Sequence, residues 1–133
     1  YKNLINVEFK QLDISTDTLP VGDIAFVRQV LQHLSNESIK KFIDQINTFK
    51  PFKYLVVTEH ISKSDFMIEN INKPSGSRMR TRFNSGVFVH KKPFLLKSNS
   101  HEVLLDVPVD LKNPLLEKSK DANSLIRTTL YKL

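Results

Sequence analysis

The feature that most constrains the fold is a strand–helix–strand pattern between residues 23 and 58. Asp23–Val27 is a nearly continuous apolar run of strand length, and Tyr54–Thr58 is a second short run rich in β-branched residues. Such runs are typical of strands buried on both faces of a parallel sheet. An amphipathic segment between them predicts a crossover helix, which makes the two strands parallel. The sequence therefore predicts a βαβ unit and an α/β fold.

The predicted helix has signals at both ends. Ser35 is a favoured N-cap residue, and Glu37 suits the positive end of the helix. The helix is expected to end at Lys50-Pro51, because the residue before a proline avoids the helical conformation. Helical spacing predicts one apolar face, formed by Ile39, Phe42, Ile43, Ile46 and Phe49.

Further strands are predicted on either side of this unit. Val7–Leu12 alternates apolar and polar residues, which predicts a short strand near a sheet edge. His101–Val107 and Ser124–Leu133 are expected to form a late antiparallel pair. Residues 70–84 are polar and basic and predict a long loop, a kind of segment that is often functional or mobile.

Composition excludes several kinds of chemistry. The chain has no cysteine, so disulfides, thiolate catalysis and thiolate-bound zinc are ruled out. Its three glycines do not cluster, which argues against a phosphate-binding loop, ATP hydrolysis and nicotinamide chemistry. No apolar run approaches the roughly 20 residues of a membrane helix, and no signal-peptide pattern opens the chain. We expect a single cytoplasmic α/β domain over residues 1–133, with no membrane partner.

The net charge of +6 is carried by the second half of the chain. Residues 61–133 hold 13 Lys and Arg against 7 Asp and Glu, whereas residues 1–60 hold 7 of each. A basic half can steer an anionic substrate or a nucleic acid. A solvated lysine surface is the favoured interpretation, because no aromatic-and-basic recognition motif accompanies the charge.

Candidate site residues follow from the rule that ligands bind at the carboxyl ends of parallel strands. These ends are predicted at Asp13, Arg28–His33 and Glu59-His60. A carboxylate at Asp13 could accept hydrogen bonds from a ligand, and a turn or capping role is an equal alternative.

The two histidines have alternatives of their own. His33 could act as a general base near neutral pH, although a structural role is favoured. Glu59 and His60 could serve in acid–base chemistry or contact a substrate, with capping an alternative for Glu59. A metal held by these three residues is disfavoured, because they lack close helical spacing.

Three arginines in the long loop form the last candidate group. Arg78, Arg80 and Arg82 could hold a carboxylate or phosphate through bidentate hydrogen bonds. A solvated basic loop is an equal alternative.

Several segments together resemble the later part of a class I S-adenosylmethionine-dependent methyltransferase. The resemblance begins with Phe9–Asp13 followed by Leu19–Asp23. It continues through Asp23–Leu34, with its Val-Leu-x-His-Leu run, and Lys53–His60 matches the fifth strand of the family. Pro93-Phe94 and the closing antiparallel pair are supporting features.

The resemblance implies a partial Rossmann-like sheet and S-adenosylmethionine as cofactor. Asp13 and Ile14 map to the residues that approach the adenine. Arg28, Gln29 and Val30 map to those that line the methionine part and the methyl group. The methyl acceptor, whose class the sequence does not identify, would face Gln32, His33, Glu59 and His60, with Arg78 and Arg82 as further substrate contacts.

The family elements that hold the ribose and the methionine tail would lie before residue 1. The chain is thus expected to be the C-terminal portion of a methyltransferase-like domain, either part of a longer enzyme or a remnant. An unpaired edge of the sheet would favour self-association. The alternative is a cofactor-free α/β binding module or remnant that uses its basic second half to bind an acidic partner or RNA.

Overall fold

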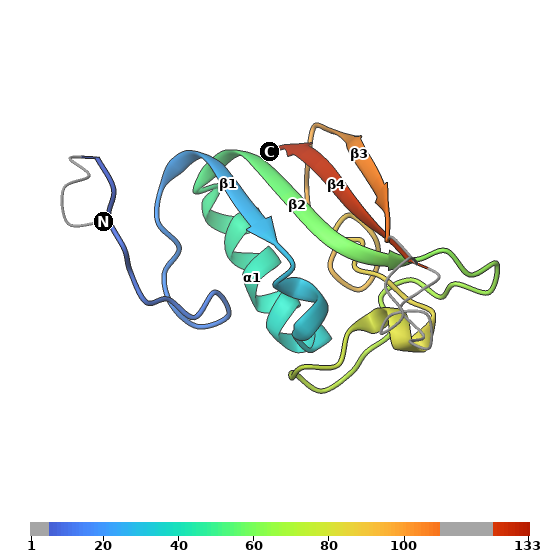
Figure 1. The fold of residues 1–133 in the computed structure, drawn as a ribbon. Helices are drawn as coiled ribbons and strands as arrows, with labels where there is room; N and C mark the ends of the chain where they lie inside the picture. The colour runs from blue at the N-terminus through green and yellow to red at the C-terminus, as the bar shows by residue number, and fades with distance from the viewer. Residues whose placement is uncertain (1–5, 110–123) are drawn as a thin grey trace.

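The computed structural model describes residues 6–109 and 124–133 and shows an α/β fold built on a mixed four-stranded sheet. The strands are β1 (Gly22–Arg28), β2 (Phe52–Ser62), β3 (Ser100–Pro108) and β4 (Ser124–Lys132), arranged in the order β1-β2-β4-β3 (Figure 1). One α-helix, α1 (Asn36–Phe49), and two short 3₁₀ turns, η1 (Leu31–His33) and η2 (Arg80–Phe83), complete the elements.

The predicted βαβ unit is confirmed. β1 and β2 are parallel, with Ala25 opposite Leu55 and Val27 opposite Val57. Helix α1 begins after Ser35, whose side chain accepts a hydrogen bond from the N–H of Ser38 at 3.2 Å. Lys50 closes the helix in the left-handed conformation, with φ of 45°.

The predicted antiparallel pair is also present, and its place in the sheet was not predicted. β4 lies between β2 and β3 and is antiparallel to both. A register shift between Val103 and Leu105 marks a β-bulge in β3. Most of the connection between β3 and β4 lies outside the described residues.

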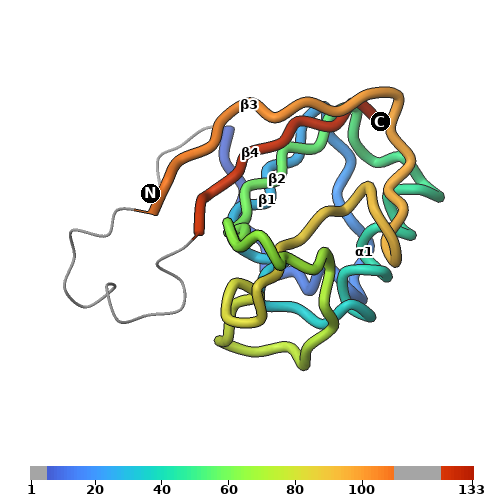
Figure 2. The backbone as a smooth tube through the Cα atoms, turned by 90° about the vertical axis from the view of Figure 1, so that its right-hand side faces the viewer, coloured from blue at the N-terminus to red at the C-terminus, as the bar shows by residue number. Residues whose placement is uncertain are grey.

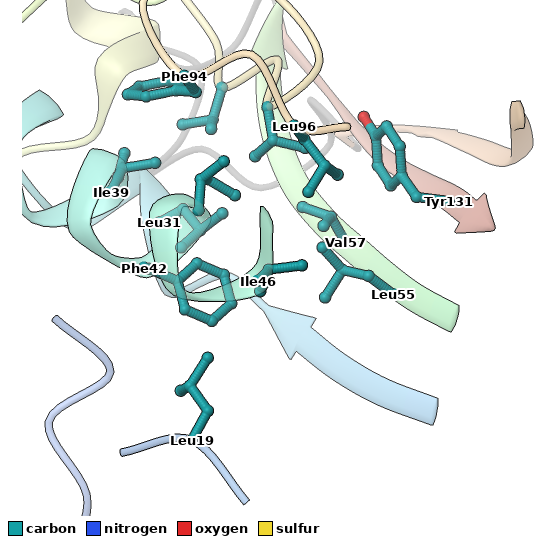
Figure 3. Packing of buried hydrophobic residues seen from close by; sticks show 13 residues of the cluster. Leu19, Leu31, Ile39, Phe42, Ile46, Leu55, Val57, Phe94, Leu96 and Tyr131 are labelled. Atoms are coloured by element: carbon teal, nitrogen blue, oxygen red, sulfur yellow. The ribbon is translucent and has the colours of Figure 1, made fainter. Parts of the chain in front are cut away.

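The hydrophobic core lies between α1 and one face of the sheet (Figures 2 and 3). The helix contributes Ile39, Phe42, Ile43 and Ile46, each at most 2% exposed. The irregular stretch after β2 closes the core with buried residues such as Val89 and Phe94. Burial of each large apolar side chain stabilises the fold by about 1.5–3 kcal/mol.

Three predictions from the sequence are wrong. Val7–Leu12 forms no strand: the chain is irregular there, and Val7 and Phe9 are 50% and 75% exposed because no neighbouring strand pairs with them. β1 is covered on one face alone: Ala25 and Val27 pack against the core, whereas Phe26 on the other face is 75% exposed. Phe49 lies in the last turn of α1, beyond the core, and is 74% exposed.

Within the described residues, no helix has the length and apolar character needed to cross a bilayer.

Candidate functional site at the carboxyl ends of β1 and β2

The chain makes a sharp turn where β1 ends. Gln29, directly after the strand, has φ of 55°, a left-handed conformation that is uncommon for a residue other than glycine. Its backbone N–H donates to the carbonyl of Thr58 on β2 at 2.7 Å, which extends the pairing of the two strands by one residue. Arg28 and Val30 on either side are exposed. The turn thus presents their side chains at the carboxyl edge of the sheet.

The carboxylate of Glu59 fixes the backbone of this turn through hydrogen bonds. Its Oε1 accepts hydrogen bonds from the N–H groups of Val30 at 3.1 Å and Leu31 at 2.8 Å, and its Oε2 accepts from that of Gln32 at 3.0 Å. The side chain is 1% exposed, so the carboxylate is almost fully shielded from solvent. Burial raises the pKa of Glu59 to about 7, while the three N–H groups and the charge of Arg80 favour its ionised form. The glutamate caps η1, as the capping alternative predicted.

Gln32 joins the two histidines of the site. Its Oε1 accepts from the backbone N–H of His60 at 3.0 Å and lies 3.1 Å from His60 Nδ1, and its Nε2 lies 3.2 Å from His33 Nε2. In this orientation Gln32 Oε1 can accept from a proton on His60 Nδ1, and Gln32 Nε2 can donate to His33 Nε2. Gln29 Nε2 approaches the same Nδ1 of His60 at 3.4 Å. Gln32 is 2% exposed, whereas both imidazoles are half-buried.

The long basic loop is docked onto the far end of η1. The carbonyl of His33 accepts from Lys73 Nζ at 3.0 Å and from the N–H of Gly76 at 2.8 Å. The carbonyl of Leu34 accepts from Arg80 Nη2 at 2.6 Å. His33 Nδ1 lies 3.3 Å from the carbonyl of Gly76, which completes the contact. A carboxylate therefore fixes the start of η1, and two cations fix its end. The backbone dipoles of a helix favour this placement of negative and positive charge.

The burial of Arg80 is the feature of this loop that the sequence did not predict. It is 1% exposed, and it also donates to the carbonyl of Ile71. Burial lowers the pKa of Arg80 to about 10, and the charge of Glu59 opposes that shift. Burial also lowers the pKa of Lys73. No sequence pattern separates Arg80 from its neighbours Arg78 and Arg82, which are both exposed.

Arg78 lines a shallow pocket beside the docked loop. The pocket has a volume of about 320 Å³ and is formed by residues 73–78 together with Phe83. Lys73 also lines it, but its amino group is bonded to His33. Arg78 is therefore the exposed cation of this pocket.

Asp13 and Ile14 are not brought to this edge. Asp13 accepts hydrogen bonds from the N–H and hydroxyl of Ser15 at 2.8 and 2.7 Å, and these bonds lower its pKa. The carbonyl of Ile14 accepts from Gln45 Nε2 on α1 at 3.3 Å. Both residues thus contact a turn and the flank of the helix, in agreement with the turn alternative for Asp13.

The described residues were also examined for metal ligands. They contain no group of three or more His, Asp or Glu side chains that could hold a metal ion.

Comparison of the chain with protein-family models, curated proteins and solved structures found no significant match.

Proposed function

We propose that this chain provides the later strands and the acceptor side of an S-adenosylmethionine-dependent methyltransferase. The observation that carries the proposal is the fixed turn at the carboxyl end of β1. Glu59 holds three consecutive N–H groups of this turn, which leaves Arg28 and Val30 exposed at the edge where open α/β sheets bind ligands. The parallel pair followed by late antiparallel strands is compatible with this class of enzyme.

Arg28, Gln29 and Val30 are the residues proposed to line the methionine part of the cofactor. The left-handed backbone of Gln29 supports this proposal, because it fixes the direction in which the turn leaves β1. No described residue offers a glycine-rich turn for the methionine tail. The bound cofactor supplies a methyl group that is already activated on a sulfonium centre.

The chain's own contribution to methyl transfer is positioning. An in-line displacement depends mainly on holding the acceptor against the methyl group, and a base helps where the acceptor must lose a proton. His60 is the proposed base, with Gln32 fixing its tautomer through Nδ1. His33 and Glu59 are proposed to position the turn, because Glu59 is buried and His33 is bonded on both ring nitrogens. Arg78 and Arg82 remain the proposed contacts for an anionic part of the acceptor.

The free edge of β1 supports a larger domain. Among the described residues β1 pairs with β2 alone, and Ile24 and Phe26 on the same strand are 51% and 75% exposed. An exposed apolar edge strand is a site for pairing with another strand. We propose that polypeptide carrying the remaining cofactor contacts pairs there and covers these side chains.

The alternative function, a module that binds RNA or an acidic partner, gains no specific support. Four cations of the basic half are engaged within the fold: Lys73 and Arg80 with backbone carbonyls, Lys91 with Glu69, and Arg127 with Asp106.

The direct test is a calorimetric titration with S-adenosylhomocysteine. The protein titrated is the product of the complete coding sequence that contains residues 1–133. We expect binding, and we expect Val30→Trp to weaken it at least tenfold, about 1.4 kcal/mol, by filling the cofactor side of the turn. Val21→Trp is the matched control, because Val21 is 89% exposed at the opposite end of β1. Absence of binding by the unmodified polypeptide would overturn the proposal.

A further inference from the structure

A second cavity lies away from the turn at β1, on the covered side of the antiparallel strands. It has a volume of about 180 Å³ and is bounded by β2, β3, β4 and residues 87–91. A cavity of roughly 150 Å³ is large enough to hold benzene. The space is therefore sufficient for a ligand with one small ring.

Part of the cavity lining is apolar. It comprises Val57 and Ile61 of β2, Val87 and Phe88 of the covering segment, and Val103 of β3. These side chains can bury the hydrocarbon body of a ligand, and such walls with a few polar groups are usual in small-molecule sites.

Basic side chains also line the cavity. They are those of His90, Lys91, His101 and Arg127. Glu59 is the acidic residue of the lining, and both of its carboxylate oxygens accept N–H groups of η1. His90, Lys91, His101 and Arg127 thus supply N–H donors to this cavity, from which an anionic group can accept hydrogen bonds.

The basic groups are held in place by their neighbours. The imidazoles of His90 and His101 stack with ring centres 4.3 Å apart, and His90 Nδ1 lies 3.1 Å from the hydroxyl of Tyr131. The carboxylate of Asp106 holds Arg127 through two hydrogen bonds of 2.8 and 2.7 Å. Lys91 is held by Glu69, which does not line the cavity. A ligand would therefore meet a largely preformed site.

We propose that this cavity binds a small organic anion, with its carboxylate toward His90, His101 and Arg127 and its hydrocarbon body against Val57 and Phe88. The site is separate from the proposed methyl-transfer site, and its test does not depend on the cofactor.

The electrostatic environment of His90 supplies an independent readout. Burial, His101 and Lys91 lower the pKa of His90, in that order, while Glu69 raises it. Tyr131 and Arg127 of β4 face the same cavity. An anion bound beside His90 stabilises its protonated form and so raises its pKa.

The test is titration of the chain with benzoate, followed by NMR of the histidine ring protons and by calorimetry. We expect saturable binding, an upward shift of the pKa of His90, and at least tenfold weaker binding of benzyl alcohol and of inorganic phosphate. No binding of benzoate would overturn the proposal. If benzyl alcohol bound as tightly as benzoate, the ligand would not need a negative charge. If phosphate bound as tightly as benzoate, the ligand would not need a hydrocarbon body. Either result would overturn the proposal.

Two variants locate the ligand. Val103→Trp fills the cavity from the edge strand β3 and is expected to weaken benzoate binding at least tenfold. Val107→Trp is the matched control on the same strand, because Val107 is similarly exposed and does not line the cavity. His101→Asn, at an exposed position, removes one ring N–H and should also weaken binding if Val103→Trp disturbs folding. Equal effects of the two tryptophan variants would contradict this location.

Discussion

The two faces of the sheet differ sharply in how they are covered. On one face, here called the covered face, Leu55 and Val57 of β2 pack under α1 and are at most 5% exposed. On the other, the open face, Phe26 of β1 and Leu105 of β3 are 75% and 55% exposed. Sequence hydrophobicity is similar on both. The difference shows that an apolar strand predicts a surface able to be buried, whereas the partner that buries it depends on the rest of the fold.

The largest expected effect comes from a matched pair of phenylalanines. Phe42 of α1 is 2% exposed on the covered face, whereas Phe26 is 75% exposed on the open face. Phe42→Ala should lower the free energy of unfolding by about 3–5 kcal/mol, and Phe26→Ala by less than about 1 kcal/mol. Urea denaturation of the chain measures both. Comparable losses would contradict the distinction between the faces.

The same pair sharpens the functional proposal. The proposal that further polypeptide pairs along β1 and covers its open face requires Phe26 to be buried in that larger protein. The cost of Phe26→Ala should then rise above about 2 kcal/mol. An unchanged small cost would argue that the open face stays exposed.

A smaller effect is expected at Glu59, the buried acid of the covered face. Its pKa is raised from 4.5 to about 7, so the folded state binds the proton more tightly than the unfolded state does. The resulting stabilisation is complete below pH 4.5 and is lost as the pH rises through about 7. Glu59→Gln cannot lose a proton, and its stability should lack this contribution.

The contribution of Glu59 to the pH dependence of stability can be measured by comparing the unmodified chain with Glu59→Gln. The free energy of unfolding of the unmodified chain, relative to Glu59→Gln, should fall by roughly 3 kcal/mol between pH 4.5 and 8, at about 1.4 kcal/mol for each unit of pKa shift. Urea denaturation at several pH values gives the two curves. Glu37→Gln, on the exposed first turn of α1, is the control expected to show no such fall. Parallel curves for the unmodified chain and Glu59→Gln would contradict the raised pKa.

The smallest effect is expected at the cap of the covering helix. Ser35→Ala removes the acceptor for the N–H of Ser38 and should cost about 1 kcal/mol. Thermal denaturation, with Ser77→Ala in the exposed loop as control, measures the difference. A loss no larger than that of the control would show that the cap does not stabilise α1.

Part of the candidate site was readable from the sequence. The rule for parallel strands predicted that Arg28–His33 and Glu59-His60 lie at one edge of the sheet, and the parallel pairing of β1 and β2 places them there. The rule could not show that the carboxylate of Glu59 accepts the N–H groups at the start of η1. A glutamate at the end of a strand is equally compatible with a capping role and with a catalytic role. Asp13 and Ile14 were misplaced relative to this edge because the strand expected at Val7–Leu12 has no partner to pair with.

The sequence by itself determined the elements whose signals are local. Ser35 and Lys50-Pro51 bound the helix, alternation marked the late strands, and the short apolar runs defined β1 and β2. Tertiary structure alone decided that β4 lies between β2 and β3, that one face stays open, and that Arg80 rather than Arg78 is buried. The physical reason is that periodicity reports which side of an element is apolar, whereas strand order and the burial of a charge depend on contacts between residues far apart in the chain.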